Sequence, residues 1–319
     1  RSIQDGAWSL LDHDKFMREL PLISALDNYV DSAFYREIIR HSIYDEFWSS
    51  YSLRKRYHEI QIPAYFITGW YDALANSTLR MFKGWKSGAA TEKARLNTRI
   101  MIGPWNHLIG PHTPIGDIDF GIESGIDIPT EHITWYDQRL KGIQTGIDDR
   151  PPVQIFVMGK NTWRYENEWP LARTQYAKFY LHSSGNANSL DGNGALDTDP
   201  PSNEPADSYV YDPNNPVPTH GGPIMDLQVS GPKDRCTVEN RSDVLDYTSE
   251  PLKYDCEVTG PVTATLYAAS SASDTDFTIT LVDVHPEGMA INICEGLRRA
   301  HTLKSDSGVF SNNVLPLDG

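Results

Sequence analysis

Two titratable residues near the middle of the chain follow short apolar runs and could together activate a nucleophile. Asp72 ends the motif G-W-Y-D after the apolar run 64–68, and His107 ends the motif G-P-W-N-H after the run 99–102. A carboxylate that accepts a hydrogen bond from one imidazole nitrogen fixes the ring tautomer, and the other nitrogen can then take a proton from a hydroxyl. We therefore predict Asp72 and His107 as catalytic residues, the acid and base of a Ser-His-Asp triad.

The elements that must position this pair are two strands and the segment between them. A short apolar run ended by turn residues is typical of a buried parallel strand, and sites in open α/β sheets form at the carboxyl ends of such strands. Residues 77–87 carry apolar side chains at helical spacing, with Gly88 as a stop. This spacing predicts a crossover helix that brings Asp72 and His107 to the same edge of a sheet.

The nucleophile of the predicted triad has no counterpart in this sequence. In α/β-hydrolases a G-x-S-x-G turn carries the serine, and the acid and base follow it in the order Asp, His. The nearest approach, residues 121–125, reads G-I-E-S-G and has the wrong spacing. We expect the serine to lie before Arg1.

Five ordered segments between residues 63 and 300 resemble the CocE/NonD family of serine hydrolases, relatives of the X-Pro dipeptidyl-peptidases. The segments are IPAYFITGWYDALANSTLRMFKGW, RIMIGPWNH, WYDQRLKG, PPVQIFVMGKNTWRYENEWP and VTGPVTATLYAASSASDTDFTITLVDVHPEGMAINICEGLRRA. The resemblance gives the acid and base roles to Asp72 and His107. It also implies that the serine and the oxyanion-hole donors belong to an N-terminal half absent here.

The resemblance implies an α/β plus all-β fold in three parts. Residues 1–58 would be the remainder of a helical cap, 59–148 the second half of an α/β-hydrolase core, and 149–319 a jelly-roll β-sandwich, apparently truncated. The residue patterns agree, since 1–58 has helical spacing without strand alternation, and 129–141 fits a last helix capped by Gly142. Beyond residue 148, strand-like runs recur at 153–158, 177–181, 209–211, 257–269 and 275–285.

Several apolar residues near the predicted pair could contact a substrate. We predict substrate contacts for Tyr71, Leu74 and Trp105, and for Trp48 from the cap region; packing is the alternative for the tryptophans, including Trp8. Relatives that hydrolyse α-amino acid esters carry acidic residues just after the triad Asp, whereas residues 73–75 here are apolar. An ammonium group would bind poorly there, so a neutral or aromatic acyl group is favoured.

Composition excludes some partners. The net charge is −15, from 28 basic and 43 acidic side chains, which disfavours nucleic acid and anionic membranes. No apolar run approaches the ~18–20 residues of a membrane span. Compartment, oligomeric state and the natural substrate are not determined, and self-association as a homo-oligomer stays open.

Neither metal ligands nor disulfides are expected, and no cofactor is predicted. The residues His107, His112, Asp117 and Asp119 match no metal template. The three cysteines are too few and too unevenly spaced for a disulfide framework, so buried thiols are predicted, with a bridge between Cys236 and Cys256 as the alternative.

The main functional hypothesis is a serine esterase or acyl hydrolase that cleaves carboxylic esters or amides, with the serine outside this chain. One alternative is an aminopeptidase of the X-Pro dipeptidyl-peptidase type, which would need an anchor for a free amino terminus. Another is a non-catalytic, carbohydrate-binding protein that keeps relics of a hydrolase. Retention of both Asp72 and His107 argues against the relic.

Overall fold

The structure is a computed structural model that describes residues 18–27, 29, 31–300 and 310–313. The chain divides into two compact units, Arg1–His58 and Glu59–Gly319. Within the described residues, no helix combines the length and the apolar character that crossing a bilayer requires.

The first unit is helical in its described part. The side chain of Ser32 accepts a hydrogen bond from the backbone N–H of Tyr35, and the side chain of Asp45 accepts one from that of Trp48, so each caps the start of a helix. Lys15, Phe16 and Met17, for which helical spacing was also predicted, lie outside the described residues. The short helices are η2 (Leu22–Ser24), α2 (Ala33–Arg40) and α3 (Glu46–Tyr51), followed by the turn η3 (Tyr57–Glu59) at the boundary.

The second unit contains a four-stranded sheet that carries the predicted pair. Its order is β1-β2-β3-β4, in which β1, β2 and β3 run parallel and β4 runs antiparallel to β3. The strands are β1 (Tyr65–Gly69), β2 (Arg99–Gly103), β3 (Val153–Val157) and β4 (Thr162–Glu166). The two strands predicted before Asp72 and His107 are thus confirmed as parallel neighbours.

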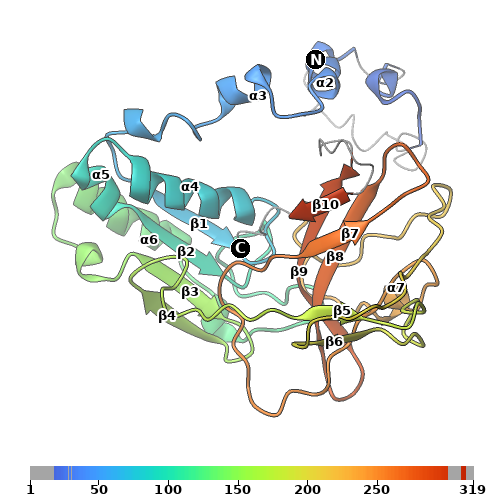
Figure 1. Cartoon of the computed structure of the whole chain (residues 1–319). Helices are drawn as coiled ribbons and strands as arrows, with labels where there is room; N and C mark the ends of the chain where they lie inside the picture. The colour runs from blue at the N-terminus through green and yellow to red at the C-terminus, as the bar shows by residue number, and fades with distance from the viewer. Residues whose placement is uncertain (1–17, 28, 30, 301–309, 314–319) are drawn as a thin grey trace. The chain divides into compact units, whose positions relative to one another are not determined.

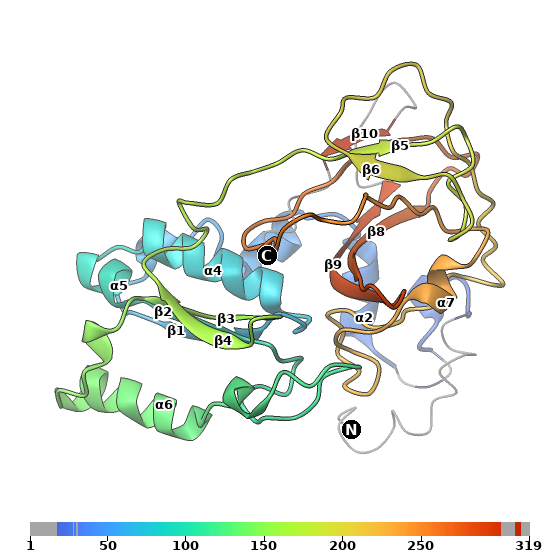
Figure 2. The same ribbon diagram turned by 90° about the horizontal axis from the view of Figure 1, so that it is seen from below.

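Helices cover both faces of this sheet (Figure 2). The crossover from β1 to β2 is formed by α4 (Ala75–Gly88) and α5 (Glu92–Asn97) on one face. The other face is covered by α6 (Ile128–Tyr136), which continues through the π-helical turn η5 (Asp137–Lys141) and ends at Gly142 with φ 69°. The helices predicted at 77–87 and 129–141 are therefore confirmed.

One hydrophobic core cluster of the second unit lies between the sheet and α4. All residues of β2 and β3 are buried, as expected for central parallel strands covered on both faces. Leu79 and Phe82 of α4 pack in one cluster with apolar residues of these strands. The other buried members of that cluster are Ile100, Ile102, Val153, Ile155, Val157, Trp169 and Leu171.

The prediction that residues 153–158 form a strand of the β-sandwich is wrong. The backbone of β3 pairs with β2, with Ile100 opposite Val153 and Ile102 opposite Ile155. A continuous apolar run fits a strand buried on both faces as well as a sandwich strand, and periodicity alone does not distinguish the two. The α/β sheet therefore extends through β4 to Glu166.

Beyond β4 the described residues form three small antiparallel sheets and one short helix (Figure 1). The paired strands are β5 (Tyr180–His182) with β6 (Ala195–Asp197), β7 (Thr265–Ala268) with β10 (Phe310–Asn313), and β8 (Asp276–Val284) with β9 (Ala290–Arg299); the helix is α7 (Cys236–Glu239). The strand predicted at 209–211 is wrong, because these residues have no strand partner. A jelly-roll arrangement stays a prediction.

The remaining short elements are two 3-10 turns, η4 (Ile122–Ser124) and η6 (Ile147–Asp149). All three cysteines are free, so the alternative of a bridge between Cys236 and Cys256 is wrong. Cys256 is exposed, which corrects the prediction of buried thiols, since an irregular segment without strand partners leaves its side chain in solvent.

Candidate active site

The loops after β1 and β2 continue the pairing of the two strands. The N–H of Trp70 donates to the carbonyl of Gly103 at 2.9 Å, and the N–H of Tyr71 donates to the carbonyl of Trp105 at 3.0 Å. The two loops therefore leave the sheet side by side. This pairing brings Asp72 and His107 to the same sheet edge.

Glycine is required in both motifs because the loops approach each other closely. A Cβ on Gly69 would lie 2.0 Å from the carbonyl oxygen of Trp105, and one on Gly103 would lie 2.4 Å from the Trp105 ring. Trp105 is 1% exposed, and its Nε1 donates to the carbonyl of Ser124 at 3.1 Å. Gly69 thus leaves room for the backbone of Trp105, and Gly103 leaves room for its buried indole ring.

Asp72 and His107 form a hydrogen-bonded pair. Asp72 Oδ1 lies 3.0 Å from His107 Nδ1, and the side chains are 3% and 39% exposed, respectively. When the carboxylate is ionised and the ring is neutral, the carboxylate can only accept, so Nδ1 carries the proton and Nε2 presents a lone pair. Among the described residues this is the one hydrogen bond of the His107 ring. The imidazole is oriented on one side and accessible on the other.

Further hydrogen bonds hold the Asp72 carboxylate in one orientation. Oδ1 also accepts from the N–H of Leu74 at 3.0 Å, and Oδ2 accepts from the Thr68 hydroxyl at 3.3 Å. Thr68 is fully buried in β1. Both carboxylate oxygens are therefore occupied, one by β1 and one by the turn into α4.

Comparisons with known proteins connect this geometry to a family. Residues 9–109 match the X-Pro dipeptidyl-peptidase (S15 family), and residues 145–316 match the X-Pro dipeptidyl-peptidase C-terminal non-catalytic domain. The chain is also 39% identical to the cocaine esterase of Rhodococcus sp. (strain MB1 Bresler) over 289 residues, which are 89% of this chain and 48% of that protein. The chain belongs to the CocE/NonD family of hydrolases.

Solved structures agree with the CocE/NonD fold. An aminopeptidase from a marine sediment Thaumarchaeota archaeon matches with a TM-score of 0.70 at 23% identity, over 91% of this chain and 48% of that one. An α-amino acid ester hydrolase matches with a TM-score of 0.68 at 22% identity, over 95% of this chain and 53% of that one. The CocE/NonD chain described here thus spans about half the length of these relatives.

The CocE/NonD chain buries two of the residues predicted to contact substrate. Tyr71 is 3% exposed, and its hydroxyl donates to the carbonyl of Asn292 at 2.9 Å. Trp105 is 1% exposed, and its ring lies tilted against the ring of Trp163 with the centroids 5.5 Å apart. Such burial favours a structural role for both. Leu74, which precedes α4, is 50% exposed and can present apolar surface.

Trp48 belongs to the first unit, in α3. Its ring packs edge-on against Phe47 with centroids 5.1 Å apart, and its Nε1 donates to the carbonyl of His41 at 2.6 Å. Contact between Trp48 and a substrate stays a prediction. Trp8 lies outside the described residues.

Two polar residues of the site were not singled out from the sequence. Thr68 lies four residues before Asp72, and a hydroxyl in an otherwise apolar strand end was the available signal. Asn106 directly precedes His107, is 4% exposed, and its Oδ1 accepts from the N–H of Leu108 at 2.9 Å. This local hydrogen bond spans His107, as asparagine side chains do in turns.

The acidic loop after His107 makes ion pairs. Nε2 of His112 lies 2.9 Å from Asp119 Oδ1, and Nζ of Lys233 lies 2.8 Å from Asp117 Oδ1. In the described part of the chain, no three residues among His, Cys, Asp and Glu are arranged to hold a metal ion.

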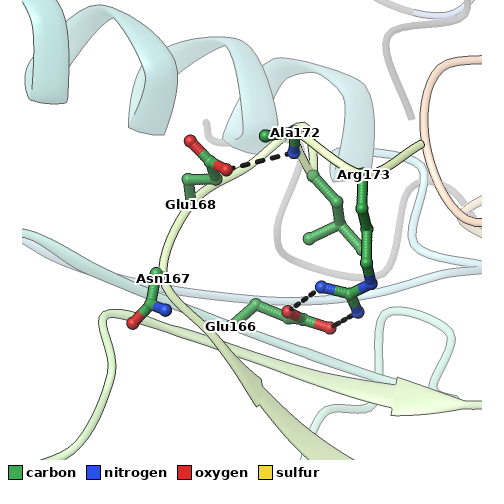
Figure 3. Close-up of a pocket in the computed structure, with 6 residues that line it drawn as sticks. Glu166, Asn167, Glu168, Ala172 and Arg173 are labelled. Atoms are coloured by element: carbon green, nitrogen blue, oxygen red, sulfur yellow. Dashed lines mark hydrogen bonds and ion pairs between the residues drawn. The ribbon is translucent and has the colours of Figure 1, made fainter.

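An open pocket of about 160 Å³ follows β4 (Figure 3). Because Glu166 pairs with Val153 at the start of β3, it lies at the amino end of the parallel strands, away from Asp72 and His107. The guanidinium of Arg173 faces the Glu166 carboxylate, and Nη1 donates to Oε2 at 2.7 Å. This ion pair lowers the pKa of Glu166. A salt bridge thus forms part of the pocket lining, and the pocket is separate from the candidate active site.

Proposed function

We propose that the protein carrying this chain is a serine hydrolase that cleaves carboxylic esters, with His107 as general base and Asp72 as its partner. The observation that carries the proposal is the 3.0 Å contact between a buried carboxylate and a partly exposed imidazole. Membership of the CocE/NonD family and 39% identity to a cocaine esterase support it.

The reaction follows from the tautomer of His107. Nε2 takes the proton of a serine hydroxyl while the serine oxygen attacks the ester carbonyl, and Asp72 stabilises the imidazolium that forms. The same proton then passes to the leaving alcohol, and an acyl-enzyme results. Water, deprotonated by Nε2, hydrolyses the acyl-enzyme and restores the serine.

The serine is proposed to lie outside this chain. The 319 residues contain no G-x-S-x-G motif, and the chain spans 48% of the cocaine esterase it matches. The oxyanion-hole donors would come from the same segment as the serine. We expect the 319-residue chain alone to turn over no ester, and serine-dependent activity from it would contradict this placement.

The acyl group is proposed to be neutral or aromatic. Residues 73–75 carry no charge, and Leu74 is half exposed beside the pair. An α-ammonium group desolvated there would lack a carboxylate partner. The match to X-Pro dipeptidyl-peptidases keeps an amide substrate as the second candidate. Comparing a p-nitrophenyl ester with an X-Pro p-nitroanilide separates the two, and preference for the anilide would favour the peptidase.

The decisive experiment uses the longest gene product that contains this chain. We expect a fluorophosphonate to label one serine and to stop hydrolysis of a p-nitrophenyl ester, and we expect His107→Ala to abolish both labelling and turnover. The matched control is His112→Ala, which removes another partly exposed, carboxylate-paired imidazole and should leave both intact. A folded protein that is not labelled would disprove the proposed function.

A further inference from the structure

Two residues that precede the proposed catalytic pair are buried and bonded to the region beyond β4. Tyr71 precedes Asp72, Asn106 precedes His107, and they are 3% and 4% exposed. Each bonds a partner more than 100 residues away in sequence. The partners, Asn292 and Ser230, both lie in the stretch 145–316 that matches a domain described as non-catalytic.

The bond from Tyr71 reaches β9. Its hydroxyl donates to the backbone carbonyl of Asn292 at 2.9 Å, and burial raises the pKa of Tyr71, which keeps the hydroxyl protonated as a donor. Because the backbone N–H of Tyr71 is bonded to the carbonyl of Trp105, this residue connects both loops to β9. The position of Asp72 therefore depends on a contact with the C-terminal region.

The bond from Asn106 reaches Ser230. Asn106 Nδ2 donates to Ser230 Oγ at 2.9 Å, and Ser230 is fully buried. Asn106 Oδ1 accepts from Leu108 across His107. One amide group therefore fixes the turn that carries His107 and attaches that turn to Ser230.

The two attachment points are joined to each other. Asn292 Oδ1 accepts from the N–H of Lys233 at 2.6 Å, and Asn292 Nδ2 donates to the carbonyl of Gly231 at 3.3 Å. The carbonyl of Pro232 accepts from the N–H of Asp117 at 2.7 Å. Segment 230–233 and Asn292 thus form one hydrogen-bonded unit that contacts the loops after both β1 and β2.

We infer that Ser230, through Asn106, and Asn292, through Tyr71, are positioning residues that hold His107 and Asp72 in register for proton transfer. The C-terminal region would then take part in catalysis without touching substrate. The inference rests on the proposed function. It has a physical basis, since a displacement of about 1 Å in a catalytic group can cost 10²-fold in rate, and a buried amide left without an acceptor shifts to find one.

The test is Ser230→Ala in the longest gene product, assayed with a p-nitrophenyl ester. We expect kcat to fall about tenfold with KM within about twofold, since a displaced general base slows proton transfer while the contacts to substrate remain. The matched control is Ser183→Ala, which removes a serine hydroxyl bonded to Asp207 Oδ2 at 2.6 Å in the same region. This control should lose comparable stability and keep its kcat.

A double-mutant cycle tells positioning from general damage. Ser230 acts on His107 through Asn106, so adding Ser230→Ala to Asn106→Ala should lower kcat no further. If the decreases in kcat of the two single variants multiply in the double variant, the inference is overturned. It is also overturned if Ser230→Ala folds and keeps the kcat of the wild-type protein. If Ser230→Ala does not fold, Tyr71→Phe tests the second attachment, because it keeps the ring and removes the hydroxyl that bonds Asn292. An unchanged kcat in Tyr71→Phe overturns the inference. An unlabelled wild-type protein would instead contradict the proposed function.

Discussion

At the scale of single residues, the site depends on which atoms of Asp72 are occupied. Oδ1 receives the His107 Nδ1–H and the Leu74 N–H, and Oδ2 receives the Thr68 hydroxyl. Each of these groups is a donor. An asparagine side chain has the same shape as aspartate, but its NH₂ group would donate from one of the two oxygen positions. It would then face one of these donors, while the volume of the site would stay the same.

Asp72→Asn tests this directly. If the amide NH₂ faces His107, the ring must carry its proton on Nε2, where it cannot act as a base. We expect kcat for a p-nitrophenyl ester to fall about 10⁴-fold, as for such substitutions in Ser-His-Asp triads. Asp119→Asn, which alters the pair with His112, is the control. A fall below tenfold would show that His107 does not need the carboxylate.

At the scale of elements, the ends of β1 and β2 are defined by glycines that permit close contact. Gly69 and Gly103 face each other in the parallel register, and each would clash with Trp105 if it carried a Cβ. The chain continues from Trp105 through Asn106 to His107. The same close approach that forms the loops therefore also places the imidazole.

Gly69→Ala should affect both stability and activity. The added Cβ would meet a backbone carbonyl, which cannot rotate away, so we expect a loss of about 1–3 kcal/mol in unfolding free energy and a lower kcat. Gly121→Ala is the comparison, because its Cβ meets nothing within 4 Å and only its φ of 83° is unfavourable. It should cost stability without slowing ester hydrolysis. Equal kcat values for the two variants would contradict this account.

At the scale of the whole molecule, buried carboxyl groups make stability depend on pH. Burial raises the pKa of Glu239 to about 7, with repulsion from Asp246 and Asp234 adding to it and Arg235 opposing it. Burial likewise raises the pKa of Asp246 to about 6. In both, the folded state holds a proton more tightly than the unfolded chain.

Because the folded state binds these protons more tightly, raising the pH lowers the free energy of unfolding. The stabilisation from these protonated groups is complete below about pH 4 and is lost as pH rises through 6 to 7. We expect urea unfolding to show wild-type protein less stable at pH 8 than at pH 5, and Glu239→Gln should reduce that difference by about 2 kcal/mol. The exposed Glu250 provides the control, Glu250→Gln. A pH difference unchanged in Glu239→Gln would rule out this carboxyl as its source.

Local sequence patterns were sufficient for the elements that carry the pair. Apolar runs ended by glycine predicted β1 and β2, helical spacing with Gly88 predicted α4, and the prediction that Asp72 and His107 lie close together follows from strand ends alone. These features depend on neighbours within a few residues. The positions of β1, β2 and α4 were therefore accessible without any tertiary information.

Long-range pairing decided the rest. The sequence alone determined that a carboxylate and an imidazole share one sheet edge. Only the tertiary structure showed that residues 153–157 join the α/β sheet, that Tyr71 and Trp105 are buried, and that Ser230 and Asn292 bond the loops. The physical reason is that these contacts join residues as many as 221 positions apart, and such a partner is chosen by the packing of the whole unit.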